Sequence, residues 1–459
     1  AFGGRSTVAE ELPTQDLAAL IDITKKADGT YLRTQGFGQP GRWWVHIANG
    51  MTIKRAMARI VRDAGINTLD NVMAVKILTD NGKACGALGW NVRTGEFVLV
   101  RAKTVVSAQG RSATRGTDNS THNPFNVWMY PYNTSAGVVL GYDVGAAVTE
   151  LDTYQRATML PKGYGCPGMN GINSSGAHEI NALGERFMGK YDPMMENGVR
   201  NNQIQGTFQE QMEGSGPPFY MDMRHVDKDV VHELQYVLMP GDKATFLDYC
   251  AQRGVDFAKA PMEVEIGEIE FSGMLATDDA FMSSLPGLYN GCVFYTFSGS
   301  MCSGYLAGES AAANLGKAPG LKGLEDEIDR ECERIFTPLT PLEDAVPQAM
   351  FESSVRQVMS YYMGFVRNEK GIDVALDRLA FLSGYADKVR AGNMHELMMT
   401  HEALHLLESC RLSTLCTRER KESGRSIYRR SDYPEKDPAY EKILAVRKGT
   451  AGPEVFWLQ

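Results

Sequence analysis

A run of β-type segments in residues 72–108 gives the clearest indication of the fold of this chain. Stretches rich in valine, isoleucine and leucine are separated by Asp80-Asn81-Gly82 and Arg93-Thr94-Gly95, two tripeptides typical of hairpin turns. The last stretch, residues 104–108, is an apolar strand that leads into Gly110. A glycine at such a turn lets the backbone approach a ligand closely. The pattern therefore predicts a β-meander followed by a strand that ends at a ligand.

Helical patterns flank this region and dominate the last part of the chain. Apolar residues keep a near-helical spacing in residues 14–26 and 51–64. Helical spacing also prevails in residues 323–416, where prolines interrupt it at positions 338, 341 and 347. In residues 118–271, by contrast, Asn, Gly, Met and Tyr are frequent and long periodic segments are few. The sequence therefore predicts an inserted, loop-rich domain followed by a helical domain.

The composition excludes several classes of protein. A chain of 459 residues is too long for one small core and is expected to form about two to four domains. Its net charge of −9 argues against nucleic acid as a partner, because phosphate binding needs a basic surface. The sequence has no apolar run long enough to span a membrane and begins without a signal-peptide pattern. We therefore expect a cytoplasmic protein with no membrane span.

The eight cysteines are scattered along the chain, without a Cys-x-x-Cys pair or a ferredoxin-type run. This distribution is typical of reduced, mostly buried thiols. It also predicts that the chain holds no iron–sulfur cluster of its own, since such clusters need closely spaced cysteine ligands.

One short motif indicates a different chemistry. His401, Glu402 and His405 form a His-Glu-x-x-His motif within a predicted helix. That spacing puts two imidazoles on one helix face and a glutamate beside them, as in zinc hydrolases. Glu422 is a conceivable distant third ligand. The competing interpretation is a chance match, since short motifs recur often.

Residues 418–434 combine Arg-Lys-Glu-Ser, an aromatic residue, two arginines, Asp and Pro after an apolar helical segment. A solvated charge run is the simple interpretation. The run nevertheless resembles the end of the helical domain in the flavoprotein subunits of succinate dehydrogenase and fumarate reductase, and more closely in the α subunit of adenylylsulfate reductase. Further short matches follow in the same order as in that family: Gly41-Arg42-Trp43, Asn49-Gly50, Tyr130-Pro131-Tyr132-Asn133, Gly163-Tyr164-Gly165, Arg200-Asn201, Gly216 to Asp222, Ser298-Gly299-Ser300 and Asn393 to Leu397.

This resemblance implies an α/β plus helical fold. We expect a Rossmann-like FAD-binding domain with a β-meander, an inserted α+β capping domain and a C-terminal helical domain. The expected boundaries are residues 1–120 and 273–322 for the two parts of the FAD-binding domain, 121–272 for the capping domain and 323–459 for the helical domain. No Gly-x-Gly-x-x-Gly follows a strand, so the family's N-terminal βαβ unit is expected to be missing from this sequence.

The resemblance further implies an FAD-dependent oxidoreductase that exchanges a hydride with a small, anionic substrate. Since no histidine precedes His46, we expect the FAD to be bound non-covalently. The family also implies that electrons pass to or from a separate iron–sulfur subunit. The residues expected at the cofactor are Gly4, Ser6, Met73, Ala108, Gln109, Gly110, Ser298, Gly299 and Ser300. A non-catalytic scaffold subunit is the alternative, because the phosphate-binding turn is missing.

Three residues are candidates for catalysis. Arg200 matches the family's substrate-domain arginine, and a guanidinium can hold an anionic group and stabilise developing charge. Arg156 and Glu268 lie near the positions of the substrate-binding histidines of fumarate reductases. Glu268 could act as a general acid or base, although an exposed strand glutamate is the simpler interpretation. Because Arg156 and Glu268 lie where fumarate reductases have histidines, we do not assume that the substrate is fumarate or adenylylsulfate.

Overall fold

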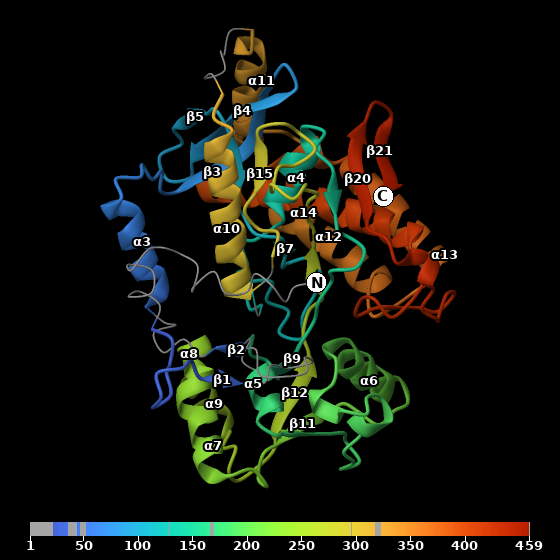
Figure 1. Cartoon of the computed structure of the whole chain (residues 1–459). Coiled ribbons are helices and arrows are strands. Elements are labelled where there is room, and N and C mark those ends of the chain that lie inside the picture. Colours follow the sequence, from blue (N-terminus) through green and yellow to red (C-terminus); the bar gives the residue numbers. More distant parts are fainter. Residues whose placement is uncertain are drawn as a thin grey trace.

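The structure is a computed structural model that describes residues 22–34, 44–45, 52–127, 129–165, 169–294, 296–316 and 323–458. Figure 1 shows two lobes, with the β-meander, helix α10 (Thr296–Ala313) and helix α14 (Met394–Glu419) in one lobe and helix α6 (Arg200–Met212) in the other. Gly4 and Ser6, and the matches at residues 41–43 and 49–50, lie outside the described residues.

The predicted β-meander is confirmed. Strands β3 (Val72–Asp80), β4 (Lys83–Asn91) and β5 (Phe97–Arg101) pair antiparallel in sequence order. Asn81 and Gly82 both adopt positive φ, of 48° and 73°, as the hairpin turn between β3 and β4 requires. Helix α3 (Ile53–Asp63) precedes the meander, and a short antiparallel pair, β1 (Arg33–Thr34) with β2 (Trp44–Val45), comes before it.

A parallel strand pair joins two segments that are far apart in the sequence. Strand β6 (Val105–Ser107), which follows the meander, pairs in parallel with β15 (Leu288–Asn290), and α10 follows β15. Between them lie β7 (Ser112–Ala113) and β13 (Phe271–Ser272), which pair antiparallel, and the chain leaves this lobe only after α4 (Ala136–Asp143) and β8 (Val148–Thr149). The segment between β7 and β13 is therefore inserted in the sequence between the two paired strands β6 and β15.

The inserted segment builds most of the second lobe. Its antiparallel sheet has the strand order β10 (His178–Ile180), β11 (Phe219–Asp222), β12 (Met262–Ile266) and β9 (Met159–Pro161). Around it lie α5 (Met169–Ser174), α6, α7 (Lys228–Glu233), η3 (Leu234–Leu238), α8 (Met239–Asp242) and α9 (Phe246–Arg253). The prediction of a loop-rich domain underestimated this order, because strands of three to five residues are too short to show a period of their own. Buried Met, Phe and Ile side chains fill its core.

The last part of the chain is helical, as predicted. It contains α11 (Glu325–Phe336), α12 (Gln348–Tyr362), α13 (Glu369–Ser383) and α14, the last of which buries residues on every face. A terminal hairpin, β20 (Leu444–Gly449) and β21 (Gly452–Trp457), pairs with β8 (Val148–Thr149), which also pairs with β14 (Met274–Leu275). Helix α4 (Ala136–Asp143) lies against this sheet. No helix within the described ranges has both the length and the apolar character that crossing a membrane requires.

In the charge run of residues 418–434, Arg420, Glu422 and Arg430 are buried, so the interpretation as a solvated face is wrong for these residues, whereas Arg418 and Arg429 are exposed. Arg420 is 2% exposed and forms ion pairs with Asp152 and with Glu422, the latter at 2.8 Å. Arg430 is fully buried and pairs with Asp432 at 2.8 Å. These arginines tie the segment after α14 to the body of the protein, since a buried charge must be paired and hydrogen-bonded.

Candidate active site

The carboxyl ends of β6 and β15 lie side by side and form the base of the candidate site. Their pairing aligns Ser107 with Asn290, and the amide of Gly291 donates to the Ser107 carbonyl at 2.8 Å. The chain turns away from β6 at Gly110, whose φ is +83°. A Cβ there would be strained by this φ and would lie 2.5 Å from Asn133 Nδ2, so it would displace the Asn133 amide. In sheets of this kind, ligands bind outside the carboxyl ends of the parallel strands.

Helix α10 packs on these two strands and begins beside their carboxyl ends. Ser298, Gly299 and Ser300, expected at the cofactor from the family match, lie within the first turns of this helix and not in a loop. A Cβ at Gly299 would lie 3.0 Å from Phe294 Cβ, and the glycine therefore allows the helix to pack closely on the segment after β15. The amino end of a helix also carries a partial positive charge that favours an electron-rich or anionic group.

The remaining predicted cofactor residues differ in their surroundings. Ala108 and Gln109 are exposed at the end of β6, between Ser107 and Gly110. Met73 packs on an apolar cluster that includes Trp90 and Leu397, which gives it a structural contact. An exposed strand end before a glycine turn, with a helix that packs on the same strands, fits the ring of a flavin, so the residues present suit the cofactor. The contribution of each residue to binding stays a prediction.

Arginine side chains gather next to this strand end. Arg111, directly after Gly110, is 7% exposed, and its Nη1 donates to the Val293 carbonyl at 3.1 Å. It forms an ion pair with Glu150 and lies over the Tyr154 ring, with 4.5 Å between the guanidinium carbon and the ring centre. Arg156 lies 5.9 Å from the same ring centre. The Tyr154 ring is therefore within cation–π distance of two guanidinium groups.

Arg156 and Glu270 connect the two segments that lead into and out of the second lobe. Their backbones exchange hydrogen bonds of 3.0 and 2.7 Å, and Arg156 Nη2 lies 2.5 Å from Glu270 Oε2. Burial raises the pKa of the fully buried Glu270 carboxyl, whereas Arg156, Arg200 and Arg111 act in the opposite direction. Burial therefore favours the protonated form of the Glu270 carboxyl, and the neighbouring arginines favour its negatively charged form.

Arg200 is the first residue of α6, and the charges of the same cluster act on its guanidinium. Burial, together with the charge of Arg156, lowers the pKa of Arg200 to about 10, although Tyr154 and Glu270 act in the opposite direction. Glu179 holds α6 in place, because its carboxylate accepts hydrogen bonds from Gln203 at 2.9 Å and Thr207 at 3.1 Å. The arrangement concentrates positive charge at the start of a helix, where an anionic group is stabilised.

The structure thus brings Arg156 and Arg200 together, as expected of a shared site. Glu268 is 2% exposed and lies two residues before Glu270, so the interpretation of an exposed strand glutamate is wrong. Arg111, Tyr154 and Glu270 were not predicted. The only local signal for Arg111 was its place directly after the strand-end glycine.

The zinc interpretation of the His-Glu-x-x-His motif is not supported by the side chains. Glu402 forms an ion pair with Arg115 at 2.8 Å, and a ring nitrogen of His401, Nε2, lies 3.0 Å from the Ile335 carbonyl. No group of three or more His, Cys, Asp or Glu side chains within the described ranges could hold a metal ion. Burial lowers the pKa of His401 to about 4 and of His405 to about 3, which keeps both rings neutral inside the helical domain.

The chain matches the family model described as "FAD binding domain" over residues 12–363. One subunit of the fumarate reductase (CoM/CoB) of Methanothermobacter marburgensis is 23% identical over 94% of this chain and 78% of its own. The L-aspartate oxidase of Streptomyces coelicolor is 26% identical over 85% of this chain and 68% of its own. Both similarities extend well beyond a single domain.

Solved structures show the same fold. The adenylylsulfate reductase of Archaeoglobus fulgidus superposes with a TM-score of 0.82 at 19% identity, covering 97% of this chain and 81% of that one. A quinol fumarate reductase of E. coli gives a TM-score of 0.81 at 21% identity, covering 96% and 81%. The expected fold class and resemblance are therefore confirmed. The chain belongs to the FAD-binding-domain family and is an FAD-dependent oxidoreductase with the fold of the fumarate reductase and adenylylsulfate reductase flavoproteins.

Proposed function

We propose that this enzyme exchanges a hydride between FAD and a small anionic substrate held by Arg156 and Arg200. The observation that supports this most is the convergence of Arg111, Arg156 and Arg200 around Tyr154, next to the carboxyl ends of β6 and β15. The segments that carry these arginines come from both lobes, so a substrate between the lobes would contact each of them. When bound, the flavin supplies the hydride chemistry.

The protein's own residues would orient the substrate and balance its charge. Arg200 would hold one anionic group of the substrate and offset charge that develops in the transition state. Arg156 would contribute a second positive charge, while its ion pair with Glu270 keeps its guanidinium in place. Glu268 is buried and lies two residues before Glu270 in the sequence. We propose that it acts as a general acid or base.

The substrate class follows from the charge of the cluster rather than from any relative. The relatives named above act as fumarate reductase and L-aspartate oxidase, and the structural neighbours as adenylylsulfate reductase and fumarate reductase. Carboxylate, phosphate and sulfate groups all bind guanidinium in the same way. We therefore propose a small compound with at least one such group.

We also propose that the FAD is held non-covalently and that an iron–sulfur subunit exchanges electrons with it. The seven cysteines within the described ranges are all free thiols, and several relatives are themselves single subunits of fumarate reductases. These names suggest multi-subunit enzymes. Pull-down of the tagged chain from its native host, followed by electron paramagnetic resonance of the co-purified protein, tests the partner. A chain that turns over at full rate without any iron-containing protein would exclude it.

The cofactor is tested on the purified protein. Acid precipitation should release the flavin into the supernatant, where chromatography should identify FAD at about one per chain. Flavin that stays with the precipitate would mean a covalent link. A colourless protein that FAD cannot reconstitute would contradict the assignment of the strand-end turn and α10 as the flavin site.

A further inference from the structure

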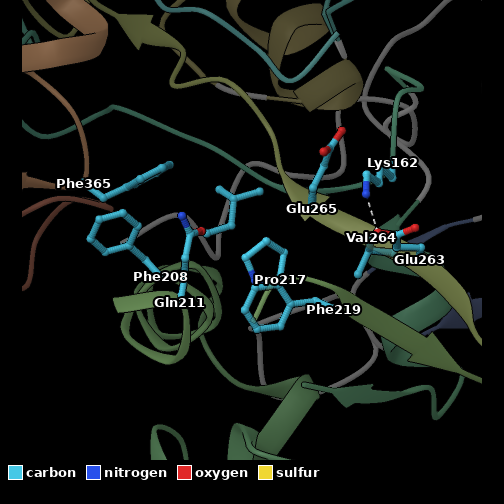
Figure 2. A pocket seen from close by; sticks show the side chains of 10 residues that line it. Lys162, Phe208, Gln211, Pro217, Phe219, Glu263, Val264, Glu265 and Phe365 are labelled. Atoms are coloured by element: carbon cyan, nitrogen blue, oxygen red, sulfur yellow. Dashed lines mark hydrogen bonds and ion pairs between the residues drawn. The ribbon is translucent and has the colours of Figure 1, made fainter. Parts of the chain in front are cut away.

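A second pocket, of about 280 Å³, lies away from the arginine cluster, where the second lobe meets the helical domain. Figure 2 shows its lining residues. The walls come from the far end of α6, from β11 and β12, and from the loop after α12. Its volume is just below the usual range for small-molecule sites, so it suits a compact ligand of about one ring and a short chain.

One side of this pocket is apolar. Phe208 of α6 and Phe365 of the helical domain place their rings 5.4 Å apart at 48°, on the left of Figure 2. Pro217, Phe219 and Val264 continue the apolar surface toward the middle of the pocket. The ring of a ligand could pack against the edges and faces of these two phenylalanine rings, so this wall favours an aromatic ligand.

The other side of the pocket is charged. Lys162 and Glu263 form an ion pair at 2.5 Å, with 54% and 35% of their side chains exposed. Glu265 adds a second carboxylate, one oxygen of which accepts hydrogen bonds from the Ser120 hydroxyl and, at 2.9 Å, from the Gly163 amide. Two carboxylates and one ammonium group leave this side with one excess negative charge.

We propose that this pocket binds a small apolar compound that carries an ammonium group. The ring of the ligand would lie against Phe208 and Phe365, and its ammonium group would face Glu263 and Glu265. Charge complementarity distinguishes this ligand from the substrate, because the arginine cluster attracts anions and the pocket's acidic side repels them. The proposal rests on the pocket alone and does not require the proposed hydride transfer.

The pocket touches the two elements that carry candidate catalytic residues. Phe208 lies eight residues after Arg200 on α6, which corresponds to about 12 Å along the helix. Strand β12, which contributes Glu263 and Glu265, leads directly to Glu268 and Glu270. Phe365 belongs to the helical domain, and its carbonyl accepts a hydrogen bond of 3.3 Å from Gln205 of α6. An occupant would therefore join α6 to the helical domain at a distance from the arginines.

Isothermal titration of the purified chain with benzylammonium tests the proposal, with benzyl alcohol and benzoate as neutral and anionic probes of the same shape. We expect benzylammonium to bind in the millimolar range, more tightly than benzyl alcohol, and benzoate not to bind at this site. Glu263→Gln should weaken benzylammonium binding about fivefold, and Lys162→Met should strengthen it, since each changes one charge near the ammonium group.

Two control variants keep the test specific. Glu213→Gln changes an exposed carboxylate at the end of α6 outside the pocket lining and should leave binding unchanged. Arg200→Lys alters the arginine cluster and should also leave it unchanged. Equal affinity for the three probes, or equal affinity of the Glu263→Gln and Lys162→Met proteins, would overturn the proposal. Circular dichroism of each variant confirms that a lost signal reflects binding and not unfolding.

Discussion

The protein contains two groups of buried or half-buried arginines that differ in how their charges are balanced. In the first group, Arg115 contacts the helical domain and donates to Glu352 at 3.0 and 2.9 Å, to Glu402 at 2.8 Å and to the Pro131 carbonyl at 2.7 Å. Burial lowers the pKa of Arg115, but the two carboxylates more than offset this and raise it overall. At the candidate active site the balance is reversed, and the pKa of Arg200 is lowered to about 10.

This difference separates a structural arginine from a binding arginine. Around Arg115 two carboxylates balance the buried charge, and the network is complete within the protein. Around Arg200 the strongest charge effect comes from another arginine, Arg156, and positive charge is concentrated. A bound anion would restore the balance at the second group, whereas the first group has no need of one.

The largest effect on stability is expected when the ion-pair network of Arg115 is disrupted. Arg115→Met should lower the free energy of unfolding by about 3–5 kcal/mol, because Glu402 would remain buried without its partner and Glu352 would keep only Arg356. Urea unfolding monitored by circular dichroism measures it. Arg447→Met serves as the control, since its pair with Glu454 is about half exposed, and a loss of at most about 1 kcal/mol is expected. Similar losses in both variants would show that the Arg115 network is not structural.

Acid should destabilise the same region through its neutral histidines. The folded-state pKa values of His401 and His405, about 4 and about 3, lie below the ordinary value of about 6.5. The unfolded chain therefore takes up protons first, so stability is complete above about pH 6.5 and decreases as the pH falls below it. Each histidine should contribute a loss of about 2–3 kcal/mol by pH 4.5. Urea unfolding at a series of pH values measures this loss, and His405→Leu should flatten the curve. An unchanged pH slope would contradict the assignment.

The arginine cluster should respond in the opposite way to the Arg115 network. Arg200→Met should lower kcat about 100-fold, as does the loss of other groups that stabilise transition-state charge, while the free energy of unfolding changes by less than about 1 kcal/mol. Steady-state turnover with an artificial electron donor or acceptor and urea unfolding give the two values. A variant that is strongly destabilised but retains its activity would make Arg200 a structural residue and remove the contrast with Arg115.

The smallest effect concerns the support of α6. Burial raises the pKa of Glu179 to about 7, so the folded state favours its protonated form. Its contribution to stability is complete below about pH 4.5 and is lost as the pH rises through 7. Glu179→Gln cannot ionise and should be more stable than the natural protein at pH 8 by about 1 kcal/mol, with little difference at pH 5. Thermal unfolding at both pH values measures it, and a less stable variant at pH 8 would contradict the expectation.

The meander and the strand-end glycine could be predicted because they depend on local patterns. Alternating apolar residues and turn tripeptides determine β3 to β5, and Gly110 occupies a conformation that few other residues adopt. The order of matches along the chain then indicated the family before any contact was known, and the family model over residues 12–363 confirms it.

The cluster around Tyr154 could be predicted only in part: the family resemblance indicated Arg156 and Arg200, whereas Arg111, Tyr154 and Glu270 join them only in the folded chain. Arg156 and Glu270 are 114 residues apart and pair through a backbone bridge that no local pattern specifies. Arg420 and Arg430 illustrate the same limit. Burial of a charged residue can be inferred only when its partner is known, and the composition of the run by itself is also typical of a solvated surface.

The central proposal is that the concentrated positive charge near Arg200 binds an anion beside FAD. Difference absorption spectra of the FAD-loaded protein, titrated with succinate, fumarate, L-aspartate, sulfate and adenylylsulfate, test it most directly. We predict that at least one anion perturbs the flavin band, and that Arg200→Met weakens its binding at least tenfold while Arg447→Met does not. A flavin spectrum that responds to none of the anions, or an Arg200→Met protein that binds as the natural protein does, would contradict the account.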